Sequence, residues 1–398
     1  MSQNLMFKSA TSFPSSELRA LFGVSSIGLG HARRSLAVAN ELRIAKPDLV
    51  LEWVCAEPAL SFLKSRGQNV LSVSTKLQSL SLAMERSSNH GRINDMGKVA
   101  RASSNIARQN YSLIKPYLKE YDVLVQDEFV ETVFSFIYEK KPALPQKRVI
   151  ITDYISFKSN SLSPVSRLVI WMANRYAKRA WMENQTRIFA DELDSLAARE
   201  SDWIKENFEI VGPIVAELPM EPKEKIRERL FTNSKRKNVV VFTVGGTSIG
   251  GDLIDFVVTD SVALSRDLDA LIVVMLGPRV AGKAQTDMQG GLLMIGFTPD
   301  AMDYFKSADC VVAQAGASTL NEVSALGVSC VSVPIANHFE QEDNARRFQQ
   351  RFGFPILHFA DLNHENLVSA IKEAMAQKYV PVCTSGAKKA AELILNIL

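Results

Sequence analysis

The stretch Val311–Arg347, "VVAQAGASTLNEVSALGVSCVSVPIANHFEQEDNARR", decides the fold prediction. It begins with an apolar strand-like run, turns through small residues, and continues as a helix that carries a single glutamate, Glu322. A second apolar run follows and leads to Gln341 and Asn344. This order is typical of parallel sheets with crossover helices, whose ligands bind beyond the carboxyl ends of the strands. The stretch therefore predicts an α/β fold with a binding site at its turns.

The same alternation of strand-like and helix-like segments extends over the whole chain, which at 398 residues is too long for one ordinary core. We expect strands at Arg19–Val24, Val50–Cys55, Val70–Val73, Val123–Gln126, Arg148–Thr152, Glu209–Val211, Val239–Val244, Leu271–Leu276, Leu292–Ile295, Cys310–Ala313, Cys330–Val333 and Ile356–Leu357. Glycine and prolines separate the two sets of strands near Gly212 and Pro213. We therefore expect a first domain over residues 1–212, a hinge linker over 213–222, a second domain over 223–380, and a C-terminal helix within 381–398 that can pack back toward the first domain.

Composition points to a globular protein without disulfides or cysteine metal ligands. Hydrophobic residues make up 46% of the chain, and no apolar run approaches the roughly 20 residues needed to cross a bilayer. The first residues lack a basic segment followed by an apolar one, so we expect a cytoplasmic location, with the inner face of a membrane as an alternative. The four cysteines are far apart and show no CxxC spacing, which predicts neither disulfides nor a metal site.

Two loops of the first half carry candidate catalytic residues. In "FGVSSIGLGHARR", Gly28 and Gly30 allow a tight turn after a strand, and His31 begins the helix, where backbone amides attract anions. In "VLVQDEF", Asp127 ends a strand of the same sheet, and a carboxylate there can orient His31 as a general base. Two alternatives stay open: an ordinary surface histidine, and an aspartate that caps the next helix.

Two turns of the second half have the composition of a nucleotide site. After the strand "VVVFTV" comes a turn of small residues whose amides and hydroxyls can hold a diphosphate, namely Gly245, Gly246, Thr247 and Ser248. In the opening stretch the chain turns at Gly316, and Ser318 and Thr319 can donate to a phosphate. Glu322 can accept from two adjacent sugar hydroxyls, although an ordinary solvated helix residue is an equal alternative.

Three motifs resemble the inverting GT-B glycosyltransferases that use nucleotide sugars, above all the bacterial peptidoglycan GlcNAc transferase family and the UDP-glycosyltransferases. They are "AGASTLNE" at Ala315–Glu322, "LGVSCVSVP" at Leu326–Pro334 and "EQEDNA" at Glu340–Ala345, in the family's order and spacing. "VGGTSIGG" is similar to the family's diphosphate loop, and "GLGHARR" to its acceptor-side loop. The resemblance spans both halves of the chain and is stronger in the second.

This resemblance implies two Rossmann-like domains facing across a cleft, with the nucleotide against the second. It places Phe297 beside the base, Glu322 on the ribose hydroxyls, and Gln341 and Asn344 on the donor sugar, while His31 is the usual base candidate. Gln314, Ala317 and Glu340 depart from the plant-type pattern, in which histidine, tryptophan and aspartate stand at these places. The identity of the sugar therefore stays open.

The predicted function is transfer of GlcNAc or a hexose from a UDP-sugar to an acceptor hydroxyl, with inversion and with neither metal nor cofactor. The acceptor is a small molecule or is lipid-linked, and no nucleic acid is involved. A non-hydrolysing UDP-GlcNAc 2-epimerase and a noncatalytic nucleotide-sugar-binding subunit are the alternatives. The segment Arg167–Met182 predicts a helix with Trp171, Trp181 and several basic residues, which suits either a membrane surface or an ordinary core helix.

Overall fold

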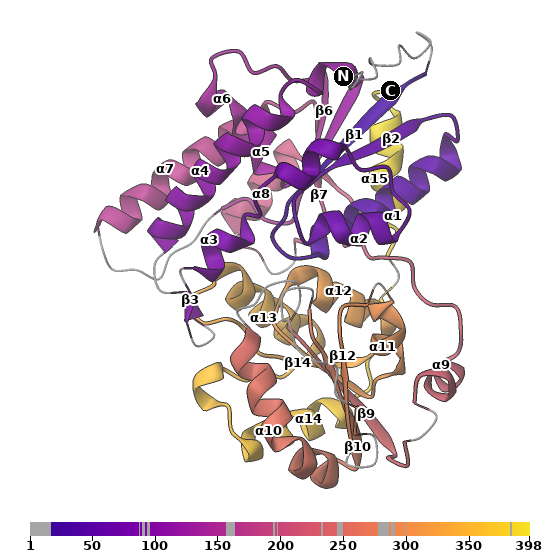
Figure 1. Cartoon of the computed structure of the whole chain (residues 1–398). Helices are drawn as coiled ribbons and strands as arrows, with labels where there is room; N and C mark the ends of the chain where they lie inside the picture. Colours follow the sequence, from indigo (N-terminus) through magenta and orange to yellow (C-terminus); the bar gives the residue numbers. More distant parts are fainter. Residues whose placement is uncertain are drawn as a thin grey trace, which may run out of the picture.

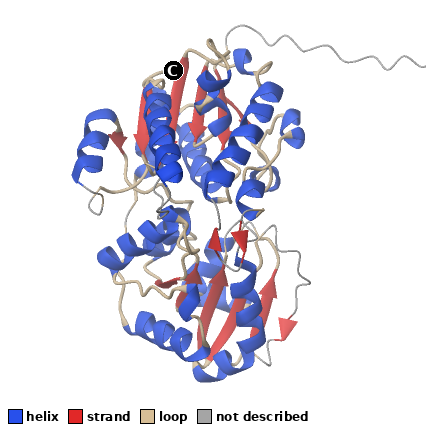
Figure 2. Cartoon of the chain, turned by 90° about the vertical axis from the view of Figure 1, so that its left-hand side faces the viewer, coloured by secondary structure: helices blue, strands red, loops and turns tan. Residues whose placement is uncertain are grey.

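Two parallel sheets, each covered by helices on both faces, form the two halves of the molecule (Figures 1 and 2). The computed structural model describes residues 17–86, 88–89, 92–93, 96–156, 164–193, 196, 198–231, 234–244, 250–277, 286–287, 291–298, 300–382 and 384–398. The first sheet has the strand order β2-β1-β5-β6-β7-β8, and the second has the order β11-β12-β10-β9-β13-β14. Within these two sheets all pairs are parallel except that of β11, so the predicted α/β class and paired doubly wound domains are confirmed.

The first half of the chain forms these elements: β1 Arg19–Val24, α1 Gly30–Ala45, β2 Val50–Val54, α2 Ala59–Ser65, α3 Ser81–Glu85, the hairpin β3 Ser88–Asn89 and β4 Arg92–Ile93, α4 Met96–Ile114, β5 Val123–Asp127, α5 Val130–Val133, α6 Ser135–Tyr138, β6 Lys147–Thr152, α7 Pro164–Met182, β7 Thr186–Phe189, α8 Ala198–Asn207 and β8 Glu209–Ile210. The second half forms α9 Lys223–Leu230, β9 Asn238–Thr243, α10 Gly251–Asp267, β10 Ala270–Met275, β11 Thr286–Asp287, β12 Leu292–Ile295, α11 Ala301–Ser307, β13 Cys310–Ala313, α12 Ala317–Leu326, β14 Ser329–Ser332, α13 Phe339–Phe352, α14 His364–Ala376 and α15 Gly386–Leu395.

Both sheets are buried on their two faces because their strands are apolar at consecutive positions. In β1, Phe22 and Val24 pack with α1 and α2, whereas Leu21 faces the opposite side with Tyr111 of α4. Val240 and Val241 of β9 divide in the same way between two core clusters. Side chains of a strand alternate between the two faces of the sheet, so a strand that is buried on both faces has apolar residues at consecutive positions.

Most predicted strands are confirmed, with ends that match or differ by one residue. Two predictions were wrong, because Val70 and Ile356 each form only one isolated bridge to a neighbouring strand. Strand β7 was not predicted, since its sequence "TRIF" is short and half polar. No helix in the described part of the chain is long and apolar enough to cross a bilayer.

The strand orders create one crevice in each domain. β1 lies between β2 and β5, and β9 lies between β10 and β13, so the chain reverses its direction of strand addition at these two places. Loops that follow such central strands diverge to opposite faces of the sheet and leave room for a ligand. The predicted catalytic loops follow β1 and β5, and the predicted nucleotide turns follow β9 and β13.

The chain crosses between the domains twice. It leaves the first domain after β8 and returns through α15, which packs beside α1 in Figure 1 and buries Ala390 and Ile394 in the first domain's core. The two crossing segments touch where a Cβ on Gly386 would lie 2.3 Å from the carbonyl oxygen of Pro213. Only glycine permits this approach. Both connections therefore meet at the place where the hinge is predicted.

Candidate active site

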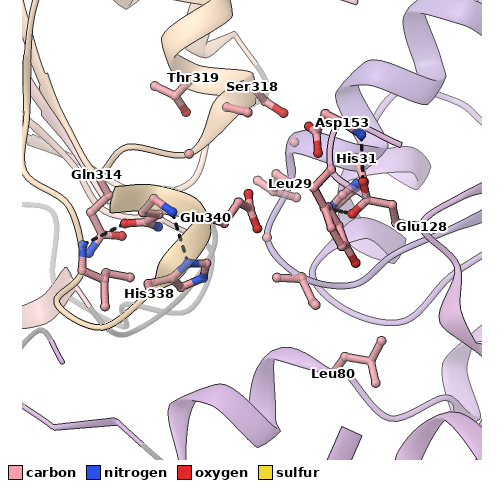
Figure 3. Close-up of a pocket in the computed structure, with 18 of the residues that line it drawn as sticks. Leu29, His31, Leu80, Glu128, Asp153, Gln314, Ser318, Thr319, His338 and Glu340 are labelled. Carbon is pink, nitrogen blue, oxygen red and sulfur yellow. Dashed lines mark hydrogen bonds and ion pairs between the residues drawn. The ribbon is translucent and has the colours of Figure 1, made fainter. Parts of the chain in front are cut away.

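A cavity of about 470 Å³ lies between the two domains, at the ends of both central strand pairs (Figure 3). Its size suits a small-molecule ligand. Predicted site residues that line it are Gly28, Gly30 and His31 of the first domain and Phe297, Gly316, Ser318, Thr319 and Gln341 of the second. The structure thus brings candidate residues from both halves of the chain to one cavity.

Asp127 fixes the orientation of His31. Its carboxylate ends β5, is fully buried, and lies with Oδ1 2.9 Å from Nδ1 of His31. Ser35 donates to the other carboxylate oxygen at 2.7 Å. A carboxylate only accepts, so Nδ1 must carry the proton in this hydrogen bond. The other ring nitrogen, Nε2, is then the one that can accept a proton from a ligand.

Arg34 joins two carboxylates beneath the cavity. Its guanidinium is buried and donates to both oxygens of Asp127, at 2.5 and 3.0 Å, and to Asp153 at 2.7 Å. Asp153 follows β6 and lines the cavity. A planar guanidinium matches two carboxylates in a fixed geometry, so Arg34 ties the loops after β5 and β6 to α1.

Glu128 faces the free side of the His31 ring. Its Oε2 lies 3.6 Å from His31 Nε2, and its Oε1 accepts from the backbone N–H of Asp153 at 3.2 Å. The backbone of Glu128 has a φ of 47°, in the left-handed region that is costly for a residue with a side chain. Such strain is common at functional sites, because the surrounding structure holds it in place. The strained turn aims Glu128 into the cavity.

The charges around His31 favour its protonated form. Burial alone would lower the pKa of His31, but the negative charges of Glu128 and Asp127 outweigh it and raise the pKa to about 9. Asp127 responds in the opposite sense: burial would raise its pKa, and Arg34 and His31 hold it well below the usual range. Burial and the charge of Asp153 raise the pKa of Glu128. Asp127 is therefore a fixed anion, and His31 and Glu128 are the groups that exchange protons.

The second domain contributes Glu340 and His338 to the same space. Figure 3 shows Glu340 on the side of the cavity that faces His31 and Asp153. Burial, followed by the charge of Asp153, raises the pKa of Glu340. His338 precedes α13 and accepts from the backbone N–H of Gln341, and burial lowers its pKa to about 4. His338 is thus a neutral group at physiological pH.

The turn before α12 meets the start of α1 across the domain boundary. A Cβ on Gly30 would lie 2.3 Å from Oγ of Ser318, so the two helix N-termini touch where the predicted acceptor loop and the predicted phosphate turn come together. Amides at both helix starts and the hydroxyls of Ser318 and Thr319 suit an anion. The other predicted phosphate turn, with Gly245, Gly246, Thr247 and Ser248, lies outside the described residues.

Glu322 is buried and paired across the domain boundary. Its Oε2 accepts from Nη1 of Arg33 at 2.9 Å, and only 3% of its side chain is exposed. It does not line the cavity, whereas Arg33 does. Glu322 therefore lies directly behind the α12 turn with an arginine on one of its oxygens, and the alternative of a solvated helix residue is wrong.

The remaining predicted residues differ in their position. Phe297 lines the cavity, and 38% of its surface is exposed. Gln341 also lines it, and its Oε1 accepts from the N–H of Ile335 at 2.9 Å. Asn344 instead lines a smaller neighbouring cavity of about 220 Å³ and donates to the carbonyl of Ala315 at 3.1 Å. In this structure Asn344 thus supports the loop before α12.

One end of the cavity is apolar. It is lined from α4, α6 and α7 and from the loop before α3 by Leu80, Val99, Ala107, Ile137, Tyr138, Ile170, Ala173 and Tyr176. Two of these residues, Ile137 and Tyr176, are also 48% and 42% exposed, so this end lies at the surface of the first domain. The cavity therefore combines a charged centre with an apolar extension toward α7.

Six residues of this site were not predicted as site residues: Arg33, Arg34, Glu128, Asp153, His338 and Glu340. Asp153 was recoverable, because it directly follows a buried strand as Asp127 does. The two arginines follow His31 in the sequence, where nothing distinguishes them from surface residues. Within the described residues there is no cluster of histidine, cysteine and carboxylate groups suited to a metal ion.

Residues 239–395 match a known domain family, the glycosyltransferase family 28 C-terminal domain. This match covers most of the second domain. In structure, the glycotransferase of kitacinnamycin is similar over 96% of this chain and 94% of its own, with a TM-score of 0.58 at 14% identity. That likeness covers both domains of the chain, and it confirms the predicted GT-B fold. The predicted resemblance to GT-B nucleotide-sugar glycosyltransferases is confirmed as well.

Two curated relatives each match only part of this chain. An uncharacterized glycosyltransferase of Methanopyrus kandleri is 28% identical over 193 residues, or 47% of this chain and 54% of the relative. The UDP-N-acetylglucosamine–N-acetylmuramyl-(pentapeptide) pyrophosphoryl-undecaprenol N-acetylglucosamine transferase of Bacillus subtilis is 29% identical over 145 residues, or 34% of this chain and 39% of the relative. The match thus spans about half or less of the length of these relatives.

The opposed pKa shifts of His31 and His338 predict two distinct titrations by NMR. Among the five imidazoles of the chain, that of His31 should lose its proton near pH 9 and that of His338 near pH 4. Glu128→Gln removes a negative charge beside Nε2, so the pKa of His31 should fall toward its ordinary value of about 6.5. Glu228→Gln on α9 is the control and should leave His31 unchanged. An ordinary titration of His31 in the unmodified protein would contradict this account.

Proposed function

We propose that this protein transfers a sugar from a UDP-sugar to an acceptor hydroxyl, with inversion and without a metal ion. The observation that supports it most is the placement of two chemically different walls in one cavity. His31 and its carboxylates form one wall, and the α12 turn of the family 28 domain forms the other. A proton acceptor and an anion site on opposite sides of a ligand are what a single displacement at a sugar carbon requires.

The donor lies against the second domain in this proposal. The diphosphate contacts Ser318, Thr319 and the amides at the start of α12, and Phe297 covers the base. The ribose hydroxyls reach Glu322 behind the turn, and Gln341 faces the sugar. Gly245, Gly246, Thr247 and Ser248 are proposed for the diphosphate from the sequence alone. The name of the Bacillus subtilis relative supports a UDP-sugar as donor.

His31 is the proposed general base. Its Nε2 takes the proton from the acceptor hydroxyl while that oxygen forms a bond to the anomeric carbon. The bond from this carbon to the UDP oxygen breaks on the opposite side, which inverts the configuration, and the electron pair leaves with UDP. Asp127 stabilises the imidazolium that results, as its low pKa keeps it ionised throughout.

Metal independence rests on the groups available to the leaving UDP. The helix N-terminus of α12 supplies amides and a partial positive charge, and Ser318 and Thr319 supply hydroxyl donors. The carboxylates of the cavity belong to the His31 side, where they already have basic partners or face one another. The donor set therefore suits direct hydrogen bonding of a diphosphate.

The acceptor is proposed to have an apolar body, either as a small molecule or as a lipid-linked substrate. The apolar end of the cavity leads toward α7, whose exposed side carries Leu168, Trp171 and Met172 at 57%, 59% and 43% exposure. Arg175 lies over the ring of Trp171 at 6.0 Å. Apolar and basic side chains together on one helix are typical of contact with an anionic membrane. A lipid-linked acceptor would enter from such a surface.

Binding of nucleotides tests the donor assignment directly. Calorimetry should show binding of UDP that is tighter than that of GDP or dTDP, because the pocket is proposed for uracil and for a complete ribose. Glu322→Gln should reduce the preference for UDP over dUDP, which differ only in the 2′-hydroxyl. A protein that binds no UDP would overturn the proposal. Turnover of a UDP-sugar without any acceptor into an isomer would indicate an epimerase.

Replacement of the base should slow transfer while leaving the donor site intact. His31→Ala should lower the rate by on the order of 10²–10⁴ with nearly unchanged affinity for UDP. In the unmodified enzyme the rate should rise as the pH increases from 7 toward 9, because His31 must first lose its proton. This rise should disappear in the variant. Full transfer by His31→Ala would show that another base is used.

Membrane contact through α7 can be tested by flotation with vesicles. The protein should float with vesicles rich in anionic lipid and should stay behind with purely zwitterionic ones, because attraction to basic residues adds to apolar contact. Trp171→Glu and Leu168→Glu should each abolish flotation. Ile44→Glu changes a residue that is 76% exposed on α1 and is the matched control. Failure of the unmodified protein to float would reject membrane contact and leave a small-molecule acceptor.

A further inference from the structure

Arg33 and Glu322 form an ion pair that joins the two domains beside the cavity. The distance between Arg33 Nη1 and Glu322 Oε2 is 2.9 Å, and the side chains are 13% and 3% exposed. Arg33 lies three residues after Gly30 on α1, and Glu322 lies four after Ser318 on α12. Residues at these spacings share one face of a helix. The ion pair is therefore the next contact behind the one between Gly30 and Ser318.

The ion pair involves the carboxylate of Glu322, which is also the proposed hydrogen-bond acceptor for the ribose of the donor. Burial raises the pKa of Glu322, and the charge of Arg33 counteracts that rise. When ribose hydroxyls donate to the same carboxylate, the guanidinium loses part of its hydrogen bonding. A buried guanidinium without an anionic partner is unfavourable, so Arg33 then needs a new acceptor.

The nearest new acceptor is the donor's own diphosphate. Arg33 lines the cavity, and Ser318 and Thr319 lie one helical turn from its present partner. Among the described residues that line the cavity, Arg33 is the sole lysine or arginine. Arg34, its neighbour, already donates to Asp127 and Asp153 below the cavity. Arg33 is thus the cation placed to meet a phosphate.

We propose that the Arg33 side chain changes its partner from Glu322 to the diphosphate of the nucleotide when the donor binds. The inference rests on the proposed donor site and assigns it a residue from the opposite domain. In the empty protein Arg33 stabilises the buried Glu322. In the complex its planar guanidinium donates to phosphate oxygens, and it neutralises the charge that accumulates on departing UDP.

The exchange also links donor binding to the position of the domains. Arg33 belongs to α1 of the first domain, and the diphosphate lies against α12 of the second. A guanidinium that moves from Glu322 to the diphosphate keeps a contact between the domains but moves it toward the reacting atoms. Binding of the donor would thereby draw His31 and its carboxylates toward the sugar of the donor.

Calorimetry with UDP and with uridine separates this role from a purely structural one. Arg33→Gln should weaken UDP binding by roughly tenfold or more, which is the loss expected for hydrogen bonds to a charged group. The same variant should bind uridine as well as or better than the unmodified protein, since Glu322 is then free for the ribose. Arg33→Lys keeps the charge but not the planar guanidinium, so its UDP affinity should lie between those of the unmodified protein and Arg33→Gln.

The control is Arg66→Gln, because Arg66 also reaches across the domain boundary, to Asp300 at 3.1 Å, but does not line the cavity. It should leave the affinity for both ligands unchanged. Unaltered or tighter UDP binding by Arg33→Gln would overturn the proposal, and so would equal losses for UDP and uridine. Thermal unfolding of each variant shows whether a loss of UDP affinity arises from misfolding. If Arg33→Gln is misfolded, the UDP and uridine affinities of Arg33→Lys decide the question. If the unmodified protein binds no UDP, the donor assignment itself fails.

Discussion

The carboxylate of Asp127 is the interaction on which the first wall of the cavity depends. It accepts from His31, from two nitrogens of Arg34 and from Ser35, and it has no exposed surface. These bonds fix the imidazole and hold Arg34, and Arg34 in turn fixes Asp153. Loss of the carboxylate would remove the anion that His31 and Arg34 share, together with four hydrogen bonds, which costs more than loss of one hydrogen bond. One side chain at the end of β5 thus orders three loops.

The lining of the cavity carries charges of both signs. The carboxylates of Glu128, Asp153 and Glu340 line it together with His31, and so do Arg33 and the turn at the N-terminus of α12. In the proposed function, an anionic diphosphate would be attracted to Arg33 and the α12 N-terminus and repelled by the carboxylates, which would favour one orientation of a nucleotide sugar. The sugar would then point toward the carboxylates and the proposed base. Electrostatics would therefore position the reacting carbon before any specific contact to the sugar forms.

The sequence predicted the fold class and the loops of the site because both depend on local patterns. Apolar runs that end in glycine or small residues identify strands and their turns, and this placed His31, Asp127 and the α12 turn correctly at strand ends. It failed where a contact depends on the packing of distant elements. Neither the pairing of Arg33 with Glu322, which needs two domains, nor the contact of Asn344 with Ala315 has a local signal. The prediction of a strand at Val70 was wrong for the same reason, since a short apolar run does not indicate which strand it pairs with, and Val70 forms only an isolated bridge.

Helix α7 illustrates how one apolar pattern can serve two surfaces. The sequence predicts that Trp171 and Trp181 both belong to a segment that suits a membrane surface or a core helix, but Trp181 is buried and packs against Trp203 and Phe208, while Trp171 is exposed. The helix thus has apolar residues on two sides, and only one side is covered by the sheet. Exposing the other costs hydrophobic free energy unless a ligand or a lipid surface covers it. The cavity reaches the surface beside this side at Tyr176, so covering the helix and delivering an apolar acceptor would be a single event.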